Sequence, residues 1–254
     1  MPAFELPQRQ VEQMDRTLTH EPSTIRLLNR WFWESLRFAL PILPVLVVIG
    51  WFRCLDAAYA AVHPAVFFLL GAPALGLGAA ILICACLLAL KWALLGRVKP
   101  GSHALWSCWC SRWDFLYVAW RVWARASLSS LEGSLLLNAW LRCMGVSIGK
   151  CVVLGPGFSQ VIDPDMLHFG DDASVAAMFQ AHTFEDRLLK IDHVRVGRGA
   201  TLGHATVPLY GADIGAGTLV AAHSVVMKHE HLLAGLRYEG APTQARPEQR
   251  AKGE

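Results

Sequence analysis

A repeat of six residues runs through the C-terminal half of the chain and restricts its fold more than any other feature. An apolar residue returns at every sixth position, at Val196, Leu202, Pro208, Ile214, Val220 and Val226. Six is the period of neither a strand nor a helix. It is typical of a parallel β-helix, in which each hexad forms one flat side of a triangular coil and its apolar residue points inward. The sequence therefore predicts a β-helix domain over 144–238.

The repeat loses its phase between Val175 and Val196. A loop that holds residues 179–190 must therefore leave the coil. Loops inserted into a regular scaffold are where functional residues concentrate. We expect the functional site at this loop.

Two long apolar runs precede the repeat. No Asp, Glu, Lys or Arg occurs from Phe38 to Phe52 or from Ala57 to Leu90. A helix needs about 20 apolar residues to cross a membrane, which the second run exceeds and the first reaches with its flanking residues. We predict a transmembrane helical hairpin over 36–95. The alternative is a hairpin that is buried in a soluble protein.

Basic residues lie on one side of this hairpin, at Arg26, Arg30, Arg37, Lys91, Arg97 and Lys99. Because Lys and Arg are enriched in cytoplasmic flanks, we predict that both termini and the β-helix domain are cytoplasmic, at the inner membrane. Residues 1–35 are polar and mixed in charge, which favours a cytoplasmic segment over a cleavable signal peptide. Residues 239–254 are predicted to form a flexible tail.

The segment 102–143 carries aromatic residues at spacings of three and four. The set consists of Trp106, Trp109, Trp113, Tyr117, Trp120 and Trp123, with the apolar Leu116 in the same pattern. This spacing places the side chains along one face of a helix. The helix could be amphipathic and lie in the membrane interface, or its aromatic face could pack on the domain that follows.

Composition excludes several classes of protein. Hydrophobic residues make up 54% of the chain and charged residues 17%, so the chain is not disordered. A net charge of +3 gives no reason to expect a nucleic-acid partner. The seven cysteines show no CxxC spacing, which argues against a zinc knuckle or a disulfide framework and favours a reducing compartment.

Several segments resemble a known family. The hexads, residues 224–228 in the last coil and Gly240-Ala241-Pro242 after it are similar to the hexapeptide-repeat acyltransferases, which fold as left-handed β-helices. A narrower resemblance extends over about 92–242. It is to the C-terminal membrane module of ε-poly-lysine-synthetase-like nonribosomal peptide synthetases, and it rests on residues 133–134, 140–142, 144–149 and 181–187.

This resemblance implies a reaction and its partners. An acyl or aminoacyl group would move from a thioester to a hydroxyl or amine. The donor would be an acyl-coenzyme A or an acyl group on the phosphopantetheine of a carrier protein, and no metal is implied. The implied assembly is a homotrimer at the membrane, and the implied partner is a nonribosomal peptide synthetase or a carrier protein.

Acyl transfer needs a base for the attacking group, and a neutral imidazole suits this role near pH 7. His182 is the best candidate because it lies in the loop that leaves the coil, where the resemblance places a catalytic histidine. Glu185, three residues on, is expected to orient the His182 ring. Both residues could instead only fix the loop by hydrogen bonds. His204 and His223 in the coils are second candidates.

For the donor, the resemblance implies a thiol arm that runs beside backbone amides of the C-terminal coils. The positions that match are Gly203, Ala221 and Ala222. Lys228 could meet a phosphate as a point charge. The alternative for Lys228 is a solvated side chain at the end of a coil.

Two other functions compete with the transferase. A γ-type carbonic anhydrase, which is also a left-handed β-helix, holds zinc between histidines, one of them five residues after a Gly-His pair. Here Gly203-His204 is followed at that spacing by Leu209, which disfavours a three-histidine zinc site. The other alternative is a non-catalytic, trimeric membrane scaffold that recruits a synthetase or couples its product to export.

Overall fold

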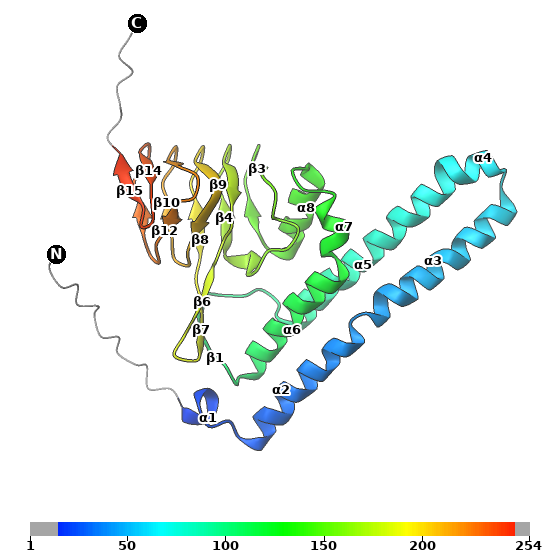
Figure 1. Cartoon of the computed structure of the whole chain (residues 1–254), viewed down its shortest axis with the longest axis horizontal. Helices are drawn as coiled ribbons and strands as arrows, with labels where there is room; N and C mark the ends of the chain where they lie inside the picture. Colours follow the sequence, from blue (N-terminus) through cyan, green and yellow to red (C-terminus); the bar gives the residue numbers. More distant parts are fainter. Residues whose placement is uncertain (1–14, 247–254) are drawn as a thin grey trace, which may run out of the picture.

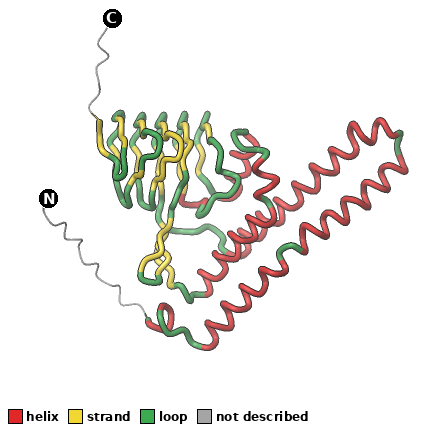
Figure 2. Tube along the Cα trace, in the orientation of Figure 1, coloured by secondary structure: helices red, strands yellow, loops and turns green. Residues whose placement is uncertain are grey.

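The computed structural model of this 254-residue chain describes residues 15–246. A set of long helices forms one part of the molecule, and a stack of β-coils forms the other (Figures 1 and 2). Residues 1–14 and 247–254 lie outside the described range. The expectations for the start of the segment 1–35 and for the end of the tail fall there.

Two long helical stretches form a hairpin. The first comprises α1 (Arg16–Thr19), α2 (Thr24–Leu36), η1 (Arg37–Ala39) and α3 (Ile42–Ala61), and the second α4 (Pro64–Val66), η2 (Phe67–Gly71) and α5 (Ala72–Leu94). By length and composition, both are apolar enough to cross a membrane, and only 6% of the apolar window of each is buried inside the protein. The structure therefore does not bury this hairpin in a core of the protein, as the alternative expected.

Helix α6 (Cys108–Trp123) lies against both α2 and α5, and α7 (Arg125–Ser129) and α8 (Leu135–Met144) lead from it to the coils. The aromatic face of α6 is buried, with Trp113, Tyr117 and Trp120 inside the protein. The indole N–H of Trp120 donates to the carbonyl oxygen of Ser159 at 2.9 Å. Of the two interpretations of this segment, the structure therefore shows packing on the rest of the protein and not an aromatic face turned to lipid.

The coils are built from stacked parallel strands. One sheet contains β2 (Ser147–Ile148), β4 (Leu167–Phe169), β8 (Val194–Val196), β10 (Asp213–Ile214) and β13 (His231–Leu232). The second contains β3 (Val153–Leu154), β5 (Ser174–Ala177), β9 (Thr201–Pro208), β11 (Leu219–Val220) and β14 (Arg237–Glu239), and β12 (Val225–Val226) pairs with the end of β9 on a third side.

The predicted left-handed β-helix is confirmed. Apolar hexad residues of successive coils are register partners: Phe169 pairs with Val196, Val196 with Ile214, and Ile214 with Leu232. All four are buried. The repeat thus forms a continuous apolar column along the axis of the coils, because three hexads complete one coil and every eighteenth residue, as from Val196 to Ile214, returns to the same side of the prism.

The predicted flexible tail is wrong at its beginning. Strand β15 (Gln244–Arg246) pairs antiparallel with β14, and Ala245 lies opposite Tyr238. The last coil presents backbone groups without a further coil to pair with, and β15 satisfies some of them.

The predicted loop 179–190 is an ordered hairpin that projects from the coils toward α6 (Figure 1). It consists of β6 (His182–Glu185) and β7 (Leu188–Ile191), and β1 (Gly101–Ala104) adds to β7 as a third antiparallel strand. Asp186 and Arg187 have φ of +48° and +61°. Two successive positive φ values are typical of a type I′ turn, which matches the twist of a two-stranded ribbon.

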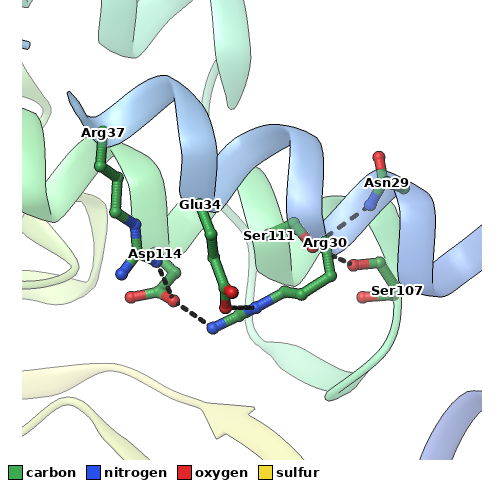
Figure 3. Close-up of polar contacts among 7 residues, drawn as sticks. All are labelled: Asn29, Arg30, Glu34, Arg37, Ser107, Ser111 and Asp114. Atoms are coloured by element: carbon green, nitrogen blue, oxygen red, sulfur yellow. Dashed lines mark hydrogen bonds and ion pairs between the residues drawn. The ribbon is translucent and has the colours of Figure 1, made fainter. Parts of the chain in front are cut away.

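Three of the basic residues that flank the helical hairpin pair with carboxylates. Arg30 and Arg37 both donate to Oδ2 of Asp114 on α6, at 2.7 and 2.5 Å (Figure 3). The ammonium of Lys91 is buried against Asp165 at 3.0 Å. Arg30, Arg37 and Lys91, which contribute to the predicted orientation in the membrane, are thus also members of ion pairs within the protein. The orientation itself stays a prediction.

Candidate functional site

The hairpin brings His182 to a buried carboxylate. Nδ1 of His182 lies 2.8 Å from Oδ2 of Asp163, and the side chains are 12% and 0% exposed. Because the carboxylate accepts this hydrogen bond, we assign the proton to Nδ1 and the lone pair to Nε2. Within residues 15–246, Nε2 has no hydrogen-bond partner. Nε2 is therefore the ring atom that can take a proton.

Two aromatic side chains of α6 hold Asp163. The indole N–H of Trp113 donates to Oδ1 of Asp163 at 2.7 Å. The hydroxyl oxygen of Tyr117 accepts the backbone N–H of Asp163 at 2.7 Å. Burial, together with the charge of Asp163, raises the pKa of Tyr117 well above its usual range, so this side chain is a neutral phenol. The aromatic face of α6 thus positions the carboxylate that orients His182.

The backbone of Asp163 is strained. Its φ is +56°, in the left-handed region, which costs a residue other than glycine about 1–2 kcal/mol. Pro164 follows at the first position of the turn η3 (Pro164–Met166), and the N–H of Met166 donates to the carbonyl oxygen of Asp163 at 2.9 Å. Such strain persists where the surrounding bonds compensate for it, which is common at functional sites.

Aromatic rings surround the imidazole of His182. The ring of Trp113 stands edge-on to it at 5.2 Å, and that of Phe184 at 6.0 Å, between ring centroids. On β1, the strand on the far side of β7, His103 stacks on Trp109 with 3.7 Å between centroids. Burial lowers the pKa of His103, which favours its neutral form. The sequence analysis did not single out His103, because a lone histidine in a short strand has no distinguishing pattern.

The expectation that Glu185 orients His182 is wrong. Both residues lie on β6, where residues three apart point to opposite faces. The carboxylate of Glu185 instead accepts from Nζ of Lys228 at 2.5 Å, and Lys228 also donates to the hydroxyl of Thr183 at 3.1 Å. Asp163 takes the place expected of Glu185.

The predicted donor residues fall at two corners of the coils. Gly203 stacks directly on the next coil at Ala221 and Ala222: a Cβ at Gly203 would lie 2.6 Å from the backbone N of Ala222. Lys228 follows β12, one side of the prism further on, where it reaches the hairpin. The Lys228 side chain is 35% exposed, and its ammonium is paired with Glu185.

Among residues 15–246, the histidine that bonds to the Asp163 carboxylate is His182 and neither of the other two candidates. His204 and His223 are exposed neighbours on successive coils, with 5.9 Å between ring centroids. A pair that the sequence analysis missed is His168 and His193, whose Nε2 and Nδ1 lie 2.8 Å apart. Among residues 15–246, no group of three or more His, Cys, Asp or Glu side chains is arranged to hold a metal ion.

No model of a known protein family matches the chain. A curated relative is the delta-poly-L-ornithine synthetase of Acinetobacter baumannii (strain AB307-0294), which is 31% identical over 252 residues. The match covers 95% of this chain and 18% of that protein. The chain therefore spans less than a fifth of the length of the curated relative that it matches.

Solved structures with a similar fold include a hexapeptide-repeat containing acetyltransferase from Vibrio cholerae, with a TM-score of 0.39 and 16% identity over 48% of this chain and 87% of that one. Serine acetyltransferase from Neisseria gonorrhoeae has a TM-score of 0.32 and 14% identity over 90% and 94%. With TM-scores below 0.5, these likenesses carry no conclusion about activity. The hexad repeat therefore forms the coils of a left-handed β-helix, and the chain is similar over nearly its whole length to one segment of a poly-ornithine synthetase.

Proposed function

We propose that this protein is a membrane-anchored transferase that moves an acyl or aminoacyl group from a thioester to a hydroxyl or amine. The observation that carries the proposal is the pair of His182 and buried Asp163, which leaves Nε2 of the imidazole as a base at the edge of the coils. A carboxylate that fixes the tautomer of a histidine also stabilises the imidazolium that forms when the histidine accepts a proton.

In the proposed reaction, Nε2 of His182 takes the proton of the acceptor hydroxyl or amine as the acceptor attacks the thioester carbonyl. A bond forms between the acceptor and the carbonyl carbon, and backbone amides support the oxyanion. The tetrahedral intermediate then expels the thiolate by breaking the carbon–sulfur bond. The imidazolium returns the proton to the thiolate, so His182 ends as it began.

The remaining parts of the proposal concern the setting of the reaction. The two long helices anchor the protein in the inner membrane, a proposal supported by their apolar composition and by the 6% of each apolar window that is buried inside the protein. The β-helix domain is cytoplasmic and assembles as a homotrimer. The synthetase relative supports a link to a nonribosomal peptide synthetase or carrier protein, which would supply the thioester if coenzyme A does not.

The test is thiol release from a panel of acyl- and aminoacyl-coenzyme A thioesters and from carrier-bound thioesters. It compares detergent-purified wild type with His182→Ala, after sizing shows the same oligomer. His231→Ala is the matched control, because His231 is an exposed histidine of the same coils. Release that is lost in His182→Ala and kept in His231→Ala supports the transferase. Equal release from all three proteins, or none from any of them with either donor class, refutes it and favours the scaffold.

A further inference from the structure

A buried ion pair joins the end of the second long helix to the first coils, and the proposed reaction uses neither of its members. Nζ of Lys91, near the end of α5, lies 3.0 Å from Oδ2 and 3.2 Å from Oδ1 of Asp165. Both side chains are 1% exposed. Removing two charges from water offsets much of their attraction, so a pair of apolar side chains would hold the two parts together equally well. Stability alone does not explain the pair.

The carboxylate of Asp165 is held from three elements. Besides Lys91 on α5, the backbone N–H of Val98, in the segment before β1, donates to Oδ2 at 3.2 Å. Gly145, which ends α8, closes the third side: a Cβ there would lie 2.2 Å from Oδ1. The position of this carboxylate is therefore set by the end of α5 and by the two segments beside it.

Asp165 shares one short turn with Asp163. Consecutive Cα atoms are 3.8 Å apart, and Pro164 between the two aspartates has its φ restricted by its ring. Asp163 extends to His182 and Trp113, while Asp165 extends to Lys91. A turn that is held at both ends, with a strained residue at one of them, transmits a displacement at one carboxylate to the other.

We propose that Lys91 and Asp165 are positioning residues for His182. Through the Asp163-Pro164-Asp165 turn, the place of α5 relative to the coils determines where the Asp163 carboxylate meets Nδ1 of the imidazole. The proposal rests on the proposed function for the role of His182 as the base. Its geometric part, a hydrogen bond at His182 that depends on Lys91, is independent of the reaction.

The test uses the double variant Lys91→Met/Asp165→Asn in the full chain, purified in detergent. It removes both charges at nearly constant volume. The readout is the Nδ1–H proton of His182 in protein labelled with ¹⁵N-histidine, which resonates far downfield when a carboxylate holds it and is assigned by its absence in His182→Ala. Arg142→Met is the matched control, since it removes a cation whose hydrogen bonds go to the carbonyl oxygens of Ile148 and Gly149 and to neither aspartate of the turn.

We expect the resonance to move upfield or broaden in the double variant, and the turnover number to fall by about tenfold to a hundredfold with an unchanged KM. The control keeps both. An unchanged resonance and turnover number in a folded double variant overturn the proposal. If the double variant does not fold, Lys91→Gln replaces it, since Gln keeps a donor toward Asp165 but removes the charge. A resonance that moves or broadens in Lys91→Gln then supports the proposal, and an unchanged resonance overturns it. Turnover that survives in His182→Ala refutes the proposed function instead, while the resonance still tests the positioning.

Discussion

Replacement of Asp163 by Asn tests the site most directly, because the two side chains have the same shape. Oδ1 of Asp163 accepts the Trp113 indole N–H at 2.7 Å, so an Asn at this position keeps its carbonyl oxygen there. Its NH₂ group then faces Nδ1 of His182 at the place of Oδ2, now 2.8 Å away. An amide donor at Nδ1 reverses the tautomer: the proton moves to Nε2, and the base is lost from the atom that needs it.

The size of the effect follows from the role of the base. General-base catalysis contributes about 10²–10⁴-fold to a rate, which is a barrier of roughly 3–5 kcal/mol. We expect Asp163→Asn to lower the turnover number by about that factor. Loss of the charge also weakens the hydrogen bond from Trp113, which costs about 1–2 kcal/mol of folding free energy.

The assay is thiol release with saturating thioester, together with thermal unfolding of the same preparations. His182→Ala provides the reference for complete loss of the base. The double variant Asp163→Asn/His182→Ala should be no slower than His182→Ala alone, since the two residues act as one unit. A fall of less than about threefold in folded Asp163→Asn would refute the reasoning, because the tautomer would then have no part in the reaction.

Three further predictions concern stability. Gly145→Ala should destabilise the protein by more than about 2 kcal/mol, since it adds a clash between Cβ and the Asp165 carboxylate to the strain of a φ of +115°. Gly157→Ala is the control: its φ is +102° and the space around it is free, so it should cost only the strain. Thermal unfolding of both variants measures the difference. Burial lowers the pKa of both His168 and His193 from 6.5, so below that pH the unfolded chain binds more protons than the folded protein, and the free energy of unfolding falls as the pH falls. His168→Phe should reduce the dependence of this free energy on pH, as measured by denaturant titrations at pH 5 to 8. Trp113→Phe should cost about 1–2 kcal/mol through the lost hydrogen bond to the site carboxylate and also slow thiol release; an unchanged rate would contradict the role given to α6.

Local patterns predicted the fold because each residue of a β-helix needs only its hexad position. Val196, Ile214 and their equivalents are spaced by the repeat itself, and the interruption before Val196 marked the inserted hairpin that contains His182. The two long helices were equally predictable, since an apolar run needs no partner to be recognised. The sequence analysis did not predict the strand β15, because β15 pairs with the unpaired edge of β14 in the last coil, and no local sequence pattern indicates that edge.

The candidate site was predicted only in part. The sequence indicated His182, but the carboxylate that it bonds to lies 19 residues earlier, in a turn that no repeat marks. The nearer candidate, Glu185, faces the other side of the hairpin and pairs with Lys228. Spacing of three would place two side chains together on a helix, yet it separates them on a strand, so the prediction depended on an element that only the structure reveals.

By itself, then, the sequence determined the six-residue coils, the two apolar helices and the histidine in the inserted segment. Each of these follows from spacing along the chain. The tertiary structure alone decided that the aromatic face of α6 packs inward, that Asp163 orients His182, and that Lys91 and Asp165 join the helical hairpin to the coils. These contacts bring together residues far apart in sequence. Which residues meet in these contacts depends on the shape and charge of the folded surfaces, and a repeat along the sequence carries no information about either.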